Sequence, residues 1–114
     1  MVPPSKANRP KRRWVGICFF QQMERESIES LIDEILPSSS ARLYDLISID
    51  YCRDITIELD TRVMMLGIVR VNLSELDKFI SKCENESRLM TVTTSGKIRL
   101  VRKRLGIDRP KVRR

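Results

Sequence analysis

The fold is decided by residues 13–20, Arg13-Trp14-Val15-Gly16-Ile17-Cys18-Phe19-Phe20, in which both alternating sets of side chains are largely apolar. A half-exposed strand alternates apolar and polar residues, whereas a strand in the middle of a sheet is apolar on both faces. The stretch therefore predicts a central strand, with cover on at least one side of the sheet.

The spacing of apolar residues predicts the helices around this strand. Residues 28–36 carry apolar side chains at i, i+3, i+4, i+7 and i+8, which predicts a helix that ends at Pro37. A similar stripe predicts a helix opened by Asn72 and Ser74 and running to residue 83. The spacing of Leu43, Leu46 and Ile47 predicts a second short helix over Ala41–Ile49, capped by Ser40.

Three further stretches read as strands. Residues 55–60 alternate apolar and polar side chains at period two, which predicts a half-exposed strand. Residues 64–71 form a more buried strand that we expect to pair with residues 55–60 as a hairpin. Residues 88–93 supply a fourth strand, and residues 97–105 a final helix.

This order of elements predicts an α+β fold of the ferredoxin-like (RRM-like) kind, a four-stranded antiparallel sheet with helices on one face plus a C-terminal basic helix. That last helix is expected on the open face of the sheet or at its edge. The chain divides into a disordered basic arm at 1–12, a single ferredoxin-like domain at 13–106 and a basic tail at 107–114.

Charge is concentrated at the two ends of the chain. Residues 1–13 carry a net +5, residues 96–114 carry +8, and the residues between them carry −6, for a total of +7. Two basic segments around a folded body are typical of a protein that binds a polyanion. Nucleic acid is therefore the first hypothesis for the partner.

Composition excludes several kinds of catalytic site. The chain has no histidine, which removes Cys/His zinc sites and the commonest general base. Its three cysteines are far apart, which indicates a reducing compartment, and we expect a cytoplasmic protein without a membrane segment. Pairs such as Asp33/Glu34 and Asp50/Asp54 read as solvated surface rather than a magnesium site. We expect no cofactor and no metal on this chain.

The strongest local motif begins at residue 95. Ser95 is a good helix N-cap, Gly96 permits close approach, and Lys97 adds charge where unpaired N–H groups and the helix dipole favour phosphate. On the helix that follows, Ile98, Val101 and Leu105 share one face, and Arg99 and Lys103 share another. The predicted RNA-binding residues are Lys11, Arg12, Arg13, Ser95, Gly96, Lys97, Arg99, Arg102, Lys103 and Arg104.

Recognition of phosphates and shape is favoured over stacking of bases on the sheet. Modules that stack RNA bases carry aromatic residues on their two central strands, and residues 66–71 contain none. Trp14 lies beside the basic arm and could stack on a base, but with Phe19 and Phe20 it is assigned to the core.

Three segments together resemble the Pop-type protein subunit of ribonuclease P, called component 2 in archaea. The first is Pro3-Pro4 followed by basic residues and the strand start at 11–15; the second is Gly-Ile-Val-Arg-Val at 67–71, followed directly by a helix. The third is Ser-Gly-Lys-Ile-Arg at 95–99, which opens a basic helix. The sequence departs from the family at Lys97, which replaces a threonine, at Trp14, which replaces a tyrosine, and throughout 37–54.

The resemblance implies a ferredoxin-like protein that supports a catalytic RNA. In that family the RNA holds the magnesium ions and removes the 5′ leader of precursor tRNA, so this chain would belong to an endoribonuclease only as a subunit. Its implied partners are ribonuclease P RNA, precursor tRNA and a second, barrel-shaped protein subunit; a homodimer and a heterotetramer both stay open.

Two other classes of function stay open at this point. A ribosomal or other structural RNA-binding protein would share the basic ends. A ferredoxin-like protein-interaction module without an RNA role would carry such ends incidentally.

Overall fold

The centre of the sheet is formed by β1 (Arg12–Phe19), as the apolar stretch predicts. This computed structural model describes residues 11–107. β1 pairs antiparallel with β3 (Met65–Asn72) on one side and with β4 (Leu89–Ser95) on the other. β2 (Arg42–Ser48) pairs antiparallel with β3, which gives the strand order β2-β3-β1-β4.

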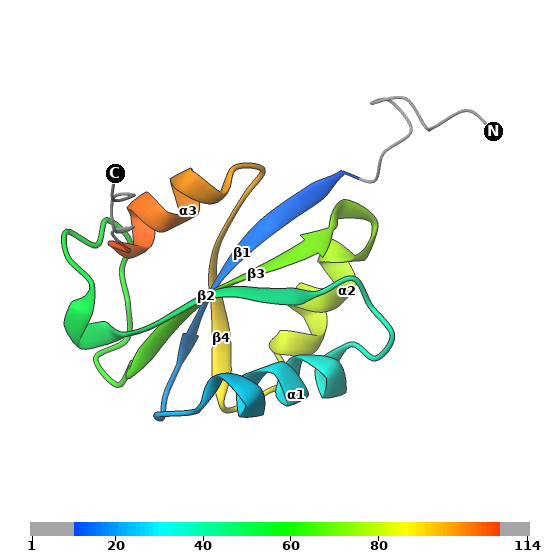
Figure 1. The fold of residues 1–114 in the computed structure, drawn as a ribbon, viewed down its shortest axis with the longest axis horizontal. Coiled ribbons are helices and arrows are strands. Elements are labelled where there is room, and N and C mark those ends of the chain that lie inside the picture. The colour runs from blue at the N-terminus through cyan, green and yellow to red at the C-terminus, as the bar shows by residue number, and fades with distance from the viewer. Residues whose placement is uncertain (1–10, 108–114) are drawn as a thin grey trace, which may run out of the picture.

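Three α-helices complete the architecture of residues 11–107. α1 (Arg25–Ile35) follows β1, α2 (Leu73–Cys83) follows β3, and α3 (Ile98–Leu105) follows β4. Figure 1 shows α1 and α2 together on one side of the sheet and α3 away from them. The predicted ferredoxin-like fold with an added C-terminal helix is confirmed.

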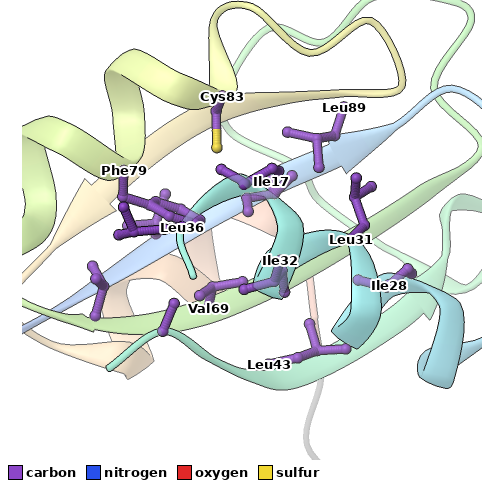
Figure 2. Packing of buried hydrophobic residues seen from close by; sticks show 14 of the residues in the cluster. Ile17, Ile28, Leu31, Ile32, Leu36, Leu43, Val69, Phe79, Cys83 and Leu89 are labelled. Carbon is purple, nitrogen blue, oxygen red and sulfur yellow. The ribbon is translucent and has the colours of Figure 1, made fainter. Parts of the chain in front are cut away.

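The larger core lies between the sheet and α1 and α2. β1 contributes Val15, Ile17 and Phe19, all fully buried, and Figure 2 shows Ile17 among the side chains of α1 and α2. The apolar stripe of α1 is buried as predicted, and from α2 Phe79 is fully buried. Full burial of one such side chain contributes roughly 1.5–3 kcal/mol, so this layer dominates the stability of the domain.

A second, smaller core lies on the other face of the sheet. It contains Cys18, Leu66 and Ile68 from the strands and Val101 and Leu105 from α3. α3 therefore covers the open face of the sheet, one of the two positions expected for it.

The chain between β2 and β3 completes this second layer. It begins with a 3-10 turn, η2 (Ile49–Tyr51), and then passes the C-terminal end of α3. The Arg53 N–H donates to the Gly106 carbonyl at 2.9 Å, and the Thr56 N–H donates to the Arg104 carbonyl at 3.0 Å. These bonds tie the connection to the helix.

Two of the predicted elements are wrong. Residues 41–49 are not a helix, because β2 occupies this stretch. Residues 55–60 are not a strand, and β3 forms its hairpin with β2 instead. The alternation of residues 55–60 reflects burial alone: Ile55, Ile57 and Leu59 pack against the second core.

Order extends slightly beyond the predicted boundary of the domain at residue 13. Arg12 belongs to β1, and the carbonyl of Lys11 accepts a hydrogen bond of 2.7 Å from the Leu73 N–H. Residues 1–10 of the predicted arm and residues 108–114 of the predicted tail lie outside the described residues.

Candidate nucleic-acid interface

α3 is seated on the sheet by its apolar side. Val101 and Leu105 are fully buried and Ile98 is half-buried, which confirms the predicted stripe. The helix can approach β1 because residue 16 is a glycine. A Cβ there would lie 2.8 Å from Cγ2 of Thr93 and 3.2 Å from Cδ1 of Leu105.

Two of the predicted RNA-binding arginines bind within the domain. The Arg102 guanidinium donates to both carboxylate oxygens of Asp45 on β2, at 2.6 and 3.1 Å. On the other side of α3, Nη1 of Arg104 donates to Oγ1 of Thr93 at 2.9 Å and to the carbonyl of Thr94 at 3.1 Å. These contacts hold α3 against both edge strands, so neither guanidinium is fully available to an external phosphate.

The other cations of α3 and its start face solvent. Lys97, Arg99 and Lys103 are exposed, and within residues 11–107 none of the three belongs to an ion pair. Arg99 and Lys103 lie at i and i+4, off the apolar stripe, as predicted. They form an exposed basic side of the helix.

The start of α3 differs from the prediction. The N-cap is Lys97, in an extended conformation and without a side-chain cap, rather than Ser95. The Ser95 hydroxyl instead accepts a hydrogen bond of 3.2 Å from the Lys97 N–H and shapes the turn before the helix. Gly96 is exposed at this turn, and a Cβ on it would lie 3.6 Å from Nη1 of Arg13.

Strand pairing brings the N-terminal cations to the same place. Trp14 of β1 lies opposite Ser95 of β4, so Lys11, Arg12 and Arg13 lie near the start of α3. Lys11 and Arg12 are exposed; Arg13 is half-buried and donates to the Arg12 carbonyl at 2.9 Å. The two basic segments, far apart in sequence, thus meet at one end of the sheet.

Two arginines that the sequence prediction omitted continue this surface. Arg42 of β2 lies opposite Arg70 of β3, and Arg70 lies opposite Trp14. Neither arginine has an acidic partner among the described residues. Arg70 could have been found as the one charge in an apolar strand. Arg42 was missed because residues 41–49 were wrongly predicted to form a helix. We give the name basic end to the cations at this end of the sheet together with those on the exposed side of α3: Lys11, Arg12, Arg13, Arg42, Arg70, Lys97, Arg99 and Lys103.

The helix α1, on the opposite side of the sheet from α3, is acidic. α1 carries four acids (Glu26, Glu29, Asp33 and Glu34) and one arginine, and all four acids are exposed. α3, on the other side, has four cations and no acid. The two helices therefore give the two sides of the sheet opposite charge.

Sites for metal or thiol chemistry are not evident in the part of the chain that the structure describes. There, no three Cys, Asp or Glu side chains are grouped so that they could hold a metal ion. Burial raises the pKa of the Cys83 thiol to about 12, so this thiol stays protonated near neutrality. None of the helices described is long and apolar enough to cross a bilayer.

The arrangement of cations at the basic end suits the binding of an extended polyanion. A scan of protein-family models and a search of the curated proteins both found no match to this chain.

Proposed function

We propose that this chain is an RNA-binding protein subunit of ribonuclease P, which supports the catalytic RNA as it removes the 5′ leader of precursor tRNA. The observation that carries the RNA-binding part is the convergence of exposed and half-buried cations from four segments at the basic end. Eight cations spread over the end of the sheet and α3 suit a phosphate backbone, which carries a row of negative charges, better than a single anion.

The polarity of charge supports a defined orientation on the RNA. Cations attract the phosphate backbone, while the acids of α1 repel it from the opposite side of the sheet. The α1 side is then left for a protein neighbour, which is where we place the second protein subunit.

Ribonuclease P is favoured among RNA-binding functions by the three segments of the resemblance. In the fold these segments are neighbours: the start of β1 pairs with the end of β3 and with the end of β4, from which α3 begins. The matched residues that the structure describes, 11–15, 67–71 and 95–99, thus lie on neighbouring elements, which supports a shared function for them.

The division of labour in this proposal leaves the chemistry to the RNA. The magnesium ions belong to the partner RNA, and the protein neutralises phosphates so that RNA segments can approach one another. Exposed Lys97, Arg99 and Lys103 are the residues of α3 best placed for this role, with Arg102 and Arg104 holding the helix in position.

Co-purification tests the proposal. The full chain, tagged at one end, is recovered from its native cell at low salt, and the RNA and proteins bound to it are identified. We expect ribonuclease P RNA together with an activity that trims precursor tRNA at its 5′ end. Recovery of ribosomal particles would favour a ribosomal role, and recovery of proteins without RNA would favour an interaction module.

A further inference from the structure

A β-bulge in the edge strand turns an aromatic ring toward the basic end. The register between β2 and β3 shifts between Leu43 and Asp45, so Tyr44 is the extra residue. In such a bulge two successive side chains leave the strand on the same side. Tyr44 therefore lies on the α3 side of the sheet with Asp45, and its side chain is 40% exposed.

Tyr44 meets Trp14 above the strand that separates them. Their ring centroids are 4.8 Å apart and the ring planes are inclined at 87°. Two perpendicular rings form a corner: a flat group that stacks on one ring meets the other ring with its edge. We call Trp14 and Tyr44 the aromatic corner.

Two arginines lie beside the aromatic corner. The Arg70 guanidinium lies 5.1 Å from the centre of the Tyr44 ring, and Arg42 is opposite Arg70 on the neighbouring strand. No carboxylate balances these two arginines among the described residues, because the nearby Asp45 is paired with Arg102. The corner thus offers an aromatic surface with positive charge beside it.

We propose that the aromatic corner binds one unpaired nucleobase of an RNA, with Arg42 and Arg70 contacting the phosphates on either side of that nucleotide. Exposed aromatic rings beside cations are the combination that single-stranded nucleic acids require, since every base has a flat face and a charged backbone. This inference rests on the proposed RNA binding and adds to it the class of RNA: a segment with an unpaired nucleotide, rather than a continuous duplex.

A structural role for the ring pair is the rival explanation. Edge-to-face aromatic pairs stabilise folds, and in this explanation Tyr44 serves only to hold β2 in place. That role predicts that loss of the ring changes stability and leaves the preference for unpaired RNA unchanged. Binding of a base predicts that loss of the ring removes this preference for unpaired RNA.

The test compares two variants of Tyr44 in the full chain. Tyr44→Leu removes the ring and keeps an apolar side chain, whereas Tyr44→Phe keeps the ring and removes only the hydroxyl. Tyr51→Leu is the matched control, because Tyr51 is 71% exposed and lies in η2, away from the aromatic corner. The probes are a short oligouridine carrying one 2-aminopurine and an RNA duplex of the same length, and thermal melting reports the fold of each variant.

We expect Tyr44→Leu to weaken binding of the oligouridine about tenfold, the order that loss of one stacked base produces, with duplex binding unchanged. Tyr44→Phe and Tyr51→Leu should bind like the wild type. The 2-aminopurine fluorescence should be quenched on binding to the wild type and to Tyr44→Phe, but not to Tyr44→Leu.

Wild-type affinity and quenching in Tyr44→Leu would overturn the inference and leave RNA binding by the cations intact. Equal weakening for the oligouridine and the duplex would also overturn it, since a stacked base cannot produce that pattern. Failure of the wild type to bind either RNA would overturn the proposed function itself.

Discussion

Arg99 and Arg102 lie three residues apart on α3 and have different surroundings. Arg99 is exposed to solvent. The side chain of Arg102 is only 14% exposed and forms an ion pair with Asp45, whose side chain is 20% exposed. Sequence alone assigned both to RNA because their chemistry is the same. Only the position of β2, with its bulge at Tyr44–Asp45, decides which arginine has a partner inside the domain.

Arg102→Ala should therefore destabilise the domain while Arg99→Ala should not. Removal of a paired, largely buried arginine leaves Asp45 without its two charge-assisted hydrogen bonds, which costs about 1–3 kcal/mol, whereas exposed substitutions stay within about 0.5 kcal/mol. Urea unfolding of the two variants measures the difference. Asp45→Ala and the double variant complete a cycle, and a coupling energy near zero would show that the pair does not hold α3.

A second prediction at the scale of residues concerns Glu75 and the pH dependence of the unfolding free energy. Its carboxylate accepts hydrogen bonds from the Ser40 hydroxyl and from the Ser40 N–H, the latter at 3.0 Å, and these bonds lower the pKa of Glu75 below its ordinary value of 4.5. A lowered pKa in the folded state means that the carboxylate stabilises the fold above pH 4.5. This stabilisation is lost as the pH falls through the lowered pKa.

Glu75→Gln should accordingly lower the unfolding free energy at pH 7, and the gap from the wild type should narrow as the pH falls below about 4.5. Urea unfolding over a series of pH values measures it. Glu84→Gln is the control, because Glu84 is exposed at the end of α2 and forms no ion pair within residues 11–107. A gap that is constant from pH 7 to pH 3 would contradict the role given to the Ser40–Glu75 hydrogen bonds.

At the scale of elements, β2 shows why a sequence pattern can mislead. A bulge inserts one residue, so Leu43 and Leu46 face the larger core while Ile47 faces the smaller one. The insertion turns the period-two spacing of a strand into i, i+3 and i+4, which is the spacing of a helix. The other elements (β1, α1, β3, α2, β4 and α3) are predicted with the right type, although the register between β1 and β4 also shifts, at Gly16/Ile17.

Residues 55–60 were wrongly predicted to form a strand, whereas β2 is a strand that was wrongly predicted to be a helix. Their alternation correctly reports an extended chain buried on one side, but alternation does not report hydrogen bonding to a neighbouring strand. β2 and β1 already occupy both edges of β3, so no place remains beside it. Pairing depends on the whole topology, which local spacing does not contain.

The prediction at the scale of elements concerns α3. Its exposed basic side is expected to bind RNA, and its apolar side packs on the sheet. Arg99→Glu together with Lys103→Glu should weaken RNA binding strongly and leave the melting temperature near that of the wild type, since both residues are exposed. Ile98→Asp should instead lower the melting temperature, because an unpaired carboxylate would be placed against the second core. RNA binding by filter retention and thermal melting measure the two effects. Unchanged RNA affinity in the double reversal, with a loss of stability equal to that of Ile98→Asp, would show that this side of α3 is scaffold.

At the scale of the whole molecule, the meeting of the two basic ends is a property of topology. Their charge is plain in the sequence, and so were most residues of the site. Their proximity follows from the pairing of Trp14 with Ser95, and the contribution of Arg42, Tyr44 and Arg70 follows from the arrangement of β2, β3 and β1. Spatial neighbours on different strands cannot be read from composition, which is why the aromatic corner was missed.

The isolated chain should not cleave precursor tRNA. It has no histidine, and within residues 11–107 no cluster of carboxylates is placed to hold a metal ion and activate water. The assay is purified protein with magnesium and a labelled precursor tRNA, with reconstituted ribonuclease P as the positive control. Specific 5′ cleavage in the absence of any RNA subunit would refute the division of labour proposed for this protein.

The most direct measurement of the central claim is the salt dependence of RNA affinity for the full chain. If about six cations reach phosphates, the logarithm of the association constant should fall with the logarithm of the salt concentration with a slope of roughly −4 to −5. The Arg99→Glu/Lys103→Glu variant should give a shallower slope by about 1.5–2. A slope near zero for the wild type would show that the basic end does not bind the RNA backbone, and would contradict the account.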